Sequence, residues 1–175
     1  MRRLILFRHA KAVPTDGSIR DYDRPLDTRG RKDAPKMGAY LARHRLVPDL
    51  AIVSPAKRTR ETWELAAAAF PVPPPVIYED RLYDASPQII LDVIKIAGGN
   101  ARNLIVVGHN PGIHQLAVLL LAAGDVNLRE QLREQLPTSG LVTIEFAFED
   151  WKKLHPQAGR LDRYVTPKTL DIALD

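Results

Sequence analysis

The chain has 175 residues, of which 45% are hydrophobic and 26% are charged, as is ordinary for one globular domain. The absence of cysteine excludes a disulfide framework, a thiolate metal site and a cysteine nucleophile. The formal net charge of +4 does not indicate a nucleic-acid-binding face, because basic residues alternate with acidic ones, as in SIRDYDRPLDTRGRKD. We therefore predict a single domain over residues 1–175 that binds no nucleic acid.

The N-terminus carries Arg2 and Arg3, but only Leu4–Phe7 follow before Arg8 interrupts the apolar run. That run is too short for the apolar region of a signal peptide. The longest apolar stretch, around Leu116–Ala123, has the length of a buried helix and not of a membrane span. We expect a cytoplasmic protein with no membrane partner.

Short aliphatic runs alternate with longer segments of helical period, a pattern typical of βαβ units around a largely parallel sheet. Strands are predicted at Leu4–Arg8, Leu50–Ser54, Pro75–Tyr78, Leu104–Val107, Leu141–Phe148 and Leu161–Val165. No long helix separates the last two, so we expect them to pair as an antiparallel hairpin at one edge of the sheet.

Helices are predicted between these strands, at Thr28–Arg45, Lys57–Phe70, Ser86–Ala97 and Pro111–Ala123. Pro35 predicts that the first helix begins near Lys32–Ala34, since proline is tolerated only in the first turn. Ser86 is expected to cap the third helix, and Gly98 follows its end. The chain beyond Thr166 is expected to contain no helix.

Polar side chains follow three of the predicted parallel strands. The first strand ends at Arg8-His9, the second leads into SPAKRTRET with Arg58, and the fourth leads into GHNPG with His109. Because ligands bind beyond the carboxyl ends of parallel strands, we expect these side chains to meet at one edge. Guanidinium groups and helix N-termini favour phosphate, so the sequence predicts a site for a phosphoryl group.

An imidazole among such donors can attack phosphorus and form a phosphoenzyme, which divides one difficult displacement into two. The arginines and the second imidazole would stabilise the transferring oxygens as their charge redistributes. This scheme requires no metal. His114 lies five residues after His109, about 140° around a helix, so the pair does not indicate a metal site.

Three motifs together, FRHAK, SPAKRTRET and VGHNPG, resemble those of the histidine phosphatase superfamily. Ala10 after the Arg-His pair, the short chain and the segment DYDRPLDTRGRKDA are most similar to the SixA-type phosphohistidine phosphatases. The resemblance implies that His9 is the phosphorylated nucleophile, that Arg8 and Arg58 bind the phosphate, and that His109 is the second catalytic histidine.

The same resemblance implies the fold and the absence of a cofactor. The expected architecture is an α/β three-layer sandwich, phosphoglycerate mutase-like, with a mixed, mostly parallel sheet of about six strands and helices on both faces. Larger relatives protonate an alkoxide leaving group with a glutamate after the third strand. The matching stretch here, EDRLYDAS, offers Glu79, Asp80 and Asp84, of which Asp84 aligns best.

Short connections leave little chain for a lid, so the predicted pocket can admit a side chain carried by another protein. An imidazole leaving group also needs less protonation than an alkoxide, because its conjugate acid has a pKa near ~6.5. The leading hypothesis is therefore a metal-independent phosphatase acting on phosphohistidine of a histidine-phosphotransfer type protein. Two alternatives stay open: a phosphatase or mutase for a small phosphomonoester, and a non-catalytic module that binds phosphoproteins. The stretch LPTSGL, residues 136–141, is interpreted as a plain turn.

Overall fold

The computed structural model describes residues 1–173 and contains one seven-stranded sheet with the order β3-β2-β4-β1-β6-β7-β5. The strands are β1 (Arg2–Arg8), β2 (Leu50–Val53), β3 (Val76–Tyr78), β4 (Asn103–Gly108), β5 (Leu121–Gly124), β6 (Leu141–Phe146) and β7 (Gly159–Val165). The helices are α1 (Thr28–Arg43), α2 (Lys57–Ala67), α3 (Pro87–Ala97), α4 (Gly112–Leu120), α5 (Val126–Glu134) and α6 (Pro167–Ala173). Short 3₁₀ turns lie at η1 (Asp21–Asp23), η2 (Asp80–Leu82) and η3 (Trp151–Lys153).

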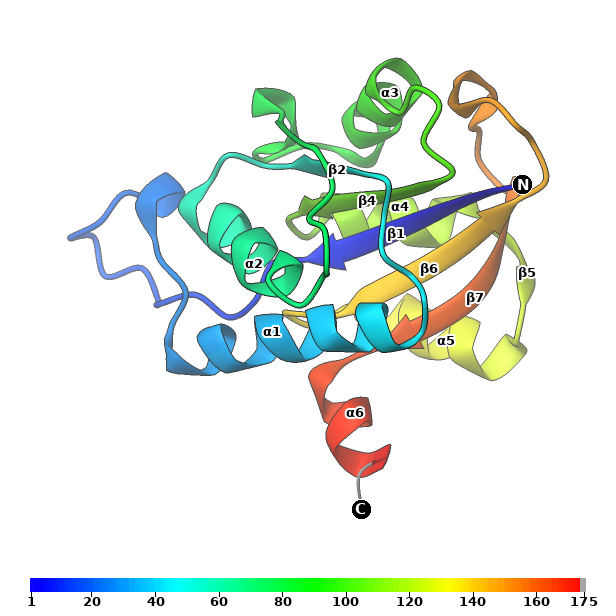
Figure 1. Cartoon of the computed structure of the whole chain (residues 1–175). Coiled ribbons are helices and arrows are strands. Elements are labelled where there is room, and N and C mark those ends of the chain that lie inside the picture. The colour runs from blue at the N-terminus through cyan, green and yellow to red at the C-terminus, as the bar shows by residue number, and fades with distance from the viewer. Residues whose placement is uncertain (174–175) are drawn as a thin grey trace.

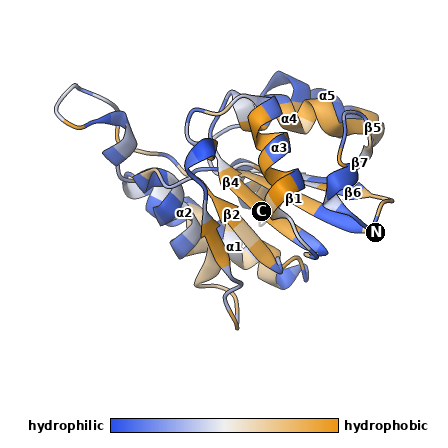
Figure 2. Cartoon of the chain, turned by 90° about the horizontal axis from the view of Figure 1, so that it is seen from above, coloured by the Kyte–Doolittle hydropathy of each residue, from blue (hydrophilic) through white to orange (hydrophobic). Residues whose placement is uncertain are grey.

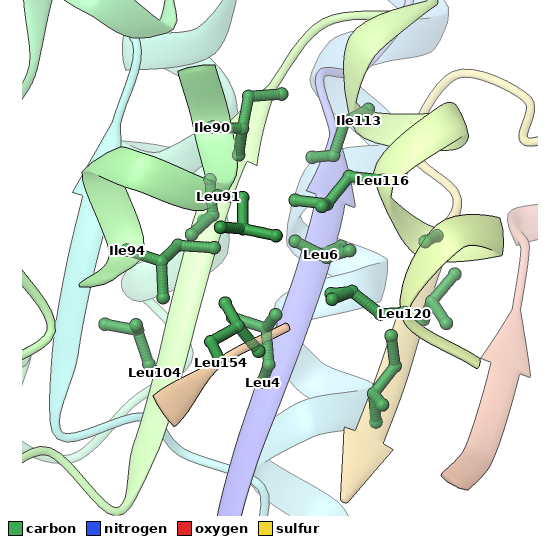
Figure 3. Packing of buried hydrophobic residues seen from close by; sticks show 14 of the residues in the cluster. Leu4, Leu6, Ile90, Leu91, Ile94, Leu104, Ile113, Leu116, Leu120 and Leu154 are labelled. Carbon is green, nitrogen blue, oxygen red and sulfur yellow. The ribbon is translucent and has the colours of Figure 1, made fainter. Parts of the chain in front are cut away.

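Helices cover both faces of the sheet, which gives the three layers seen in Figure 1. Side chains of β1 alternate between the faces, as expected for a central strand of a sheet covered on both sides. Leu4 and Leu6 pack against α3 and α4, where Figure 3 shows them among leucine and isoleucine side chains. Ile5 and Phe7 pack on the opposite face against α1 and α2. All four side chains are fully buried, so the strand that ends at the candidate site is held rigidly.

The sheet is mixed and mostly parallel. Strands β1, β2, β3 and β4 run parallel to one another, whereas β6 is antiparallel to both β1 and β7. The carboxyl ends of β1, β2 and β4 therefore lie side by side. Figure 2, seen from above, shows these central strands largely in orange, the colour of hydrophobic residues. The expected fold class is confirmed, with seven strands in place of about six.

The late strands pair as the expected antiparallel hairpin, but they do not form the edge of the sheet. Strand β5 pairs in parallel with β7 and lies outside it. The prediction of helix through Ala123 was wrong, because α4 ends at Leu120 and the apolar residues that follow turn into β5. The pairing with β7 overrides the helical propensity of leucine and alanine there.

One helix boundary also differs from the prediction, and one helix was not predicted. Helix α1 begins at Thr28 and not near Lys32–Ala34, because the Asp27 carboxylate caps it by accepting from the Gly30 amide at 2.8 Å. Pro35 lies inside this helix, where it removes one backbone donor without ending the helix. Helix α5 lies where no element was predicted, and Asp125 caps it.

The expectation of a helix-free C-terminal tail was wrong over its described part, since α6 follows Thr166. Thr166 and Thr169 exchange side-chain and backbone hydrogen bonds at the start of this helix. Residues 174–175 lie outside the described part of the chain. The Ser86 cap and Gly98 at the end of α3 are confirmed. Among residues 1–173, no helix has both the length and the apolar character needed to cross a membrane.

Candidate active site

The backbone of His9 is held by three segments at the carboxyl end of β1. The His9 amide donates to the Gly108 carbonyl at 3.1 Å, and the Ser139 amide donates to the His9 carbonyl at 3.0 Å. The next amide, of Ala10, donates to Thr62 Oγ1 on α2 at 2.9 Å. The end of β4, the turn before β6 and helix α2 together fix the position of this histidine.

One hydrogen bond determines the tautomer of the His9 ring. Nδ1 lies 2.7 Å from the Ala10 carbonyl oxygen, which can only accept, so Nδ1 carries the proton and Nε2 carries the lone pair. The residue is 8% exposed. Burial, together with the charges of Arg58 and Arg8, lowers the pKa of His9 from its ordinary 6.5 to about 3. The ring is therefore neutral, with a nucleophilic nitrogen available.

The second histidine lies directly beside the first. The centroids of the His9 and His109 rings are 5.4 Å apart, and the edge-on ring of Tyr83 lies 5.5 Å from His109. His109 Nε2 is 2.8 Å from Ser54 Oγ. The Ser54 hydroxyl has no other acceptor among the described residues, so we assign it as donor to Nε2 and place the proton of His109 on Nδ1. That buried Nδ1 has no hydrogen-bond partner within residues 1–173.

Burial also keeps the second imidazole neutral. It lowers the pKa of His109 to about 3, and the neighbouring His9, Arg58 and Arg8 act in the same direction. A neutral imidazole with its proton on Nδ1 can donate one hydrogen bond to an oxyanion. The site thus places a nucleophilic nitrogen, His9 Nε2, beside a hydrogen-bond donor, His109 Nδ1.

Arg8 is held by the turn that precedes β6. Its Nη1 donates to the Leu136 carbonyl at 3.0 Å, and the same carbonyl accepts from Asn110 Nδ2 at 2.9 Å. Burial first, and then the like charge of Arg58, lowers the pKa of Arg8 below its ordinary value. Two cations close enough to repel each other indicate that an anion is the missing partner.

Arg58 comes from the first turn of α2 and is 6% exposed. Its terminal nitrogens both bind Asp21: Nη1 donates to the backbone carbonyl at 2.7 Å, and Nη2 donates to Oδ2 at 3.1 Å. The guanidinium carbon lies 6.0 Å from the centroid of the Tyr83 ring. Its Nε is buried and has no partner within the described chain.

Unpaired polar atoms gather at these strand ends. Seven buried side-chain nitrogen or oxygen atoms lack a partner within residues 1–173, and five belong to this site: Arg8 Nε, Arg58 Nε, His109 Nδ1, Ser139 Oγ and Asn110 Oδ1. Buried polar groups in proteins are nearly always hydrogen-bonded, so such a cluster indicates a ligand. All but the Asn110 oxygen can donate, which suits an oxyanion such as a phosphoryl group.

The structure brings together four of the predicted site residues, namely Arg8, His9, Arg58 and His109. Asp84 follows Tyr83 on backbone with φ of 57°, is exposed, and makes no side-chain hydrogen bond within residues 1–173. Of the other two candidates for proton donor, Glu79 pairs with Arg81 at 3.0 Å, and Asp80 is exposed. The role of Asp84 stays a prediction.

Sequence reasoning missed three residues that shape the site: Asp21, Ser54 and Tyr83. Ser54 was visible as the first residue of SPAKRTRET, and Asp21 as the first of DYDRPLD. Ser139 does lie in a turn, as interpreted, but its φ of 63° directs its amide onto the His9 carbonyl. No group of three or more His, Asp or Glu side chains in the described chain is arranged to hold a metal ion.

Comparisons with known proteins point to one family. The model of the histidine phosphatase superfamily (branch 1) matches residues 4–87. An uncharacterised protein of Mycobacterium tuberculosis is 34% identical over 163 residues, which cover 92% of this chain and 99% of that protein.

Two solved structures of SixA proteins resemble nearly the whole chain. The one from Agrobacterium tumefaciens is 29% identical, covers 95% of this chain and 98% of its own, and superposes with a TM-score of 0.78. The one from Nakamurella multipartitia is 27% identical, covers 95% and 96%, and gives a TM-score of 0.82.

Proposed function

Because the chain belongs to the histidine phosphatase superfamily and is of the SixA type, we propose that it hydrolyses phosphohistidine on a partner protein, through a phosphoenzyme formed on His9 and without a metal. The observation that carries the proposal is the state of His9. Its proton is held on Nδ1 by the Ala10 carbonyl, which leaves Nε2 as a neutral nucleophile among unpaired donors.

In the first step, His9 Nε2 attacks phosphorus and the bond from phosphorus to the substrate nitrogen breaks. The Arg8 and Arg58 Nε–H groups and the His109 Nδ1–H group are the donors available to the phosphoryl oxygens. The Ala10 carbonyl keeps the Nδ1 proton in place while positive charge develops on the His9 ring. In the second step, water attacks phosphorus, the bond to Nε2 breaks, and the lone pair returns to His9.

The protonation states around the site favour an imidazole as leaving group. Asp21, the carboxylate bound to Arg58, has a pKa lowered to about 2 by hydrogen bonds from Tyr83, Arg24 and Arg58, so it cannot supply a proton at neutral pH. An alkoxide leaving group needs such a proton, whereas an imidazole that is protonated on its far nitrogen departs neutral. A protein of the histidine-phosphotransfer type is therefore the favoured substrate, and a small phosphomonoester is the alternative.

The test follows phosphate release from a histidine-phosphorylated phosphotransfer protein and, separately, from small phosphomonoesters, with and without a chelator. His9→Ala is the test variant, and His155→Ala, which changes an exposed loop histidine, is the matched control. We expect chelator-resistant release mainly from phosphohistidine, abolished only by His9→Ala, and an acid-labile, alkali-stable phosphoenzyme in the wild type.

Other outcomes lead to different functions. Faster release from a small ester would assign the protein to metabolism. Tight binding of the phosphoprotein without release would indicate a binding module. Retention of most activity by His9→Ala would exclude the mechanism.

A further inference from the structure

Residues 10–27 join β1 to α1 and extend beyond the carboxyl ends of the strands, as Figures 1 and 2 show from two directions. The base of this segment is tightly closed. The Val13 amide donates to the Pro25 carbonyl at 2.9 Å, and the Asp27 amide donates to the Lys11 carbonyl at 3.0 Å. The two ends of the segment are therefore held together, and the position of its middle part, residues 14–23, depends on other contacts.

The tip of the segment, residues 14–23, is hydrogen-bonded to the active site through one residue, Asp21. Among the hydrogen bonds within residues 1–173, those of Asp21 alone join the tip to the chain outside residues 10–27. The Asp21 carboxylate accepts from Arg58 Nη2, from Tyr83 OH at 2.5 Å and, on its other oxygen, from Arg24 Nε at 3.0 Å. The adjacent Tyr22 packs edge-on against Tyr83 with ring centroids 5.1 Å apart.

These contacts use the two terminal nitrogens of Arg58 and leave its third donor, Nε, available for a ligand. The carbonyl and carboxylate of Asp21 take the terminal nitrogens, while Nε stays unpaired and buried beside the two histidines. A guanidinium on a flexible stem has several rotamers, and only a second anchor keeps its remaining donor in one place. Asp21 supplies that anchor from outside the pocket.

We propose that Asp21 is a positioning residue: its carboxylate locks Arg58 and Tyr83 against His109, so that Arg58 presents Nε to a bound phosphoryl group. This inference rests on the proposed function in one respect, namely that the bound ligand is a phosphoryl group. Asp21 touches the substrate in neither step, and it acts entirely through Arg58 and Tyr83.

Two other roles for Asp21 make different predictions. A proton donor would need a carboxylic acid at neutral pH, which the low pKa of Asp21 disfavours, and its function would be lost in Asp21→Asn. A carboxylate that competes with phosphate for Arg58 would weaken binding when present, so its removal would tighten binding. A positioning residue has the opposite effect, because its removal frees Arg58 to move.

The test measures binding of inorganic phosphate by titration calorimetry and kcat with the substrate that the wild type turns over. Four variants are compared: Asp21→Ala, Asp21→Asn, Arg58→Ala and the double variant Asp21→Ala/Arg58→Ala. Asp23→Ala is the matched control, because Asp23 lies in the same turn with a similar side-chain exposure, 44% against 49%, but pairs with Arg20.

Asp21→Ala is expected to weaken phosphate binding and to lower kcat by roughly 10- to 100-fold, the scale of a charge-assisted hydrogen bond. Asp21→Asn keeps an acceptor for Arg58 or Tyr83, so most of the function should return, and Asp23→Ala should behave as wild type. In the Arg58→Ala background, Asp21→Ala should have almost no further effect, because the residue through which it acts is gone.

Tighter phosphate binding by Asp21→Ala would overturn the proposal in favour of competition. Additive effects of the two substitutions, or no phosphate binding by the wild type, would also overturn it. A wild type that binds phosphate but turns over no phosphorylated substrate would refute the proposed function alone. The role of Asp21 would still be tested by phosphate binding to the single and double variants.

Discussion

The two buried imidazoles should make stability depend on pH in a way that can be calculated. His9 and His109 each have a pKa of about 3 in the folded chain, against an ordinary value of 6.5. Below pH 6.5 the unfolded chain takes up protons that the folded chain does not, so stability falls as the pH falls, until the folded histidines are themselves protonated near pH 3. Above pH 6.5 both states are neutral and the dependence vanishes.

The size of the effect at pH 5 depends little on how low the folded pKa is. Between pH 7 and pH 5 the unfolded imidazole becomes almost fully protonated while the folded one stays neutral, which costs about 2 kcal/mol per histidine and about 4 kcal/mol for both. This cost is a large part of the free energy of unfolding of a typical domain, which is roughly 5–15 kcal/mol.

Urea unfolding in phosphate-free buffer between pH 7 and pH 5 measures the effect directly. The wild type, His9→Ala and His109→Ala are compared by their slopes with pH, because each substitution also changes the absolute stability. Each single variant should lose about 2 kcal/mol less than the wild type over this range, and other titrating groups cancel in the difference. Parallel curves for all three proteins would refute the conclusion that the histidines are buried and neutral.

Three further substitutions and one control substitution test the surroundings of these histidines. Ser54→Ala removes the partner of His109 Nε2 and should cost about 1–3 kcal/mol in urea unfolding, with a lower kcat. Gly112→Ala should be destabilising by about 1–3 kcal/mol, because its Cβ would lie 2.0 Å from a carbonyl oxygen, whereas Gly108→Ala, whose nearest contact is 3.6 Å, should unfold like the wild type. Asp84→Asn should slow turnover of an alkyl phosphate about 100-fold if Asp84 is the proton donor, and should leave phosphohistidine turnover nearly unchanged.

The sequence could predict that Arg8, His9, Arg58 and His109 meet, because their meeting depends on the parallel direction of the strands that they end or follow. Each residue ends or follows a parallel strand, and parallel strands deliver their carboxyl ends to the same edge. The apolar pattern that identifies those strands is strong, since their side chains are buried on both faces of the sheet. At these four residues, the apolar strand pattern in the sequence is therefore enough to predict the position of the side chains at the edge of the sheet.

Asp21, Tyr83 and Ser139 could not be predicted in the same way, because each lies in a connection whose path is set by distant contacts. Asp21 reaches Arg58 across 37 positions of sequence, and Tyr83 reaches Asp21 across 62. The φ of 63° at Ser139 is a conformation that non-glycine residues seldom adopt, so the turn pattern alone does not indicate it. Strand β5 was missed for a related reason, since its short apolar sequence suits a helix until β7 pairs with it.

The charges of the site bear on which phosphoryl compound it suits. Burial first, and then the charges of the guanidinium groups, disfavour protonated imidazoles at the site. Hydrogen bonds from Tyr83, Arg24 and Arg58 hold the Asp21 carboxyl ionised. The hydrogen bond from Tyr83 to Asp21, and then burial, likewise raise the pKa of that phenol. The groups nearest the nucleophile thus resist giving up or taking up a proton at neutral pH, which favours substrates whose leaving group departs without one. A phosphoramidate such as phosphohistidine meets that condition, because its leaving nitrogen becomes part of a neutral imidazole, whereas an alkyl phosphate needs a proton donor that these groups do not supply.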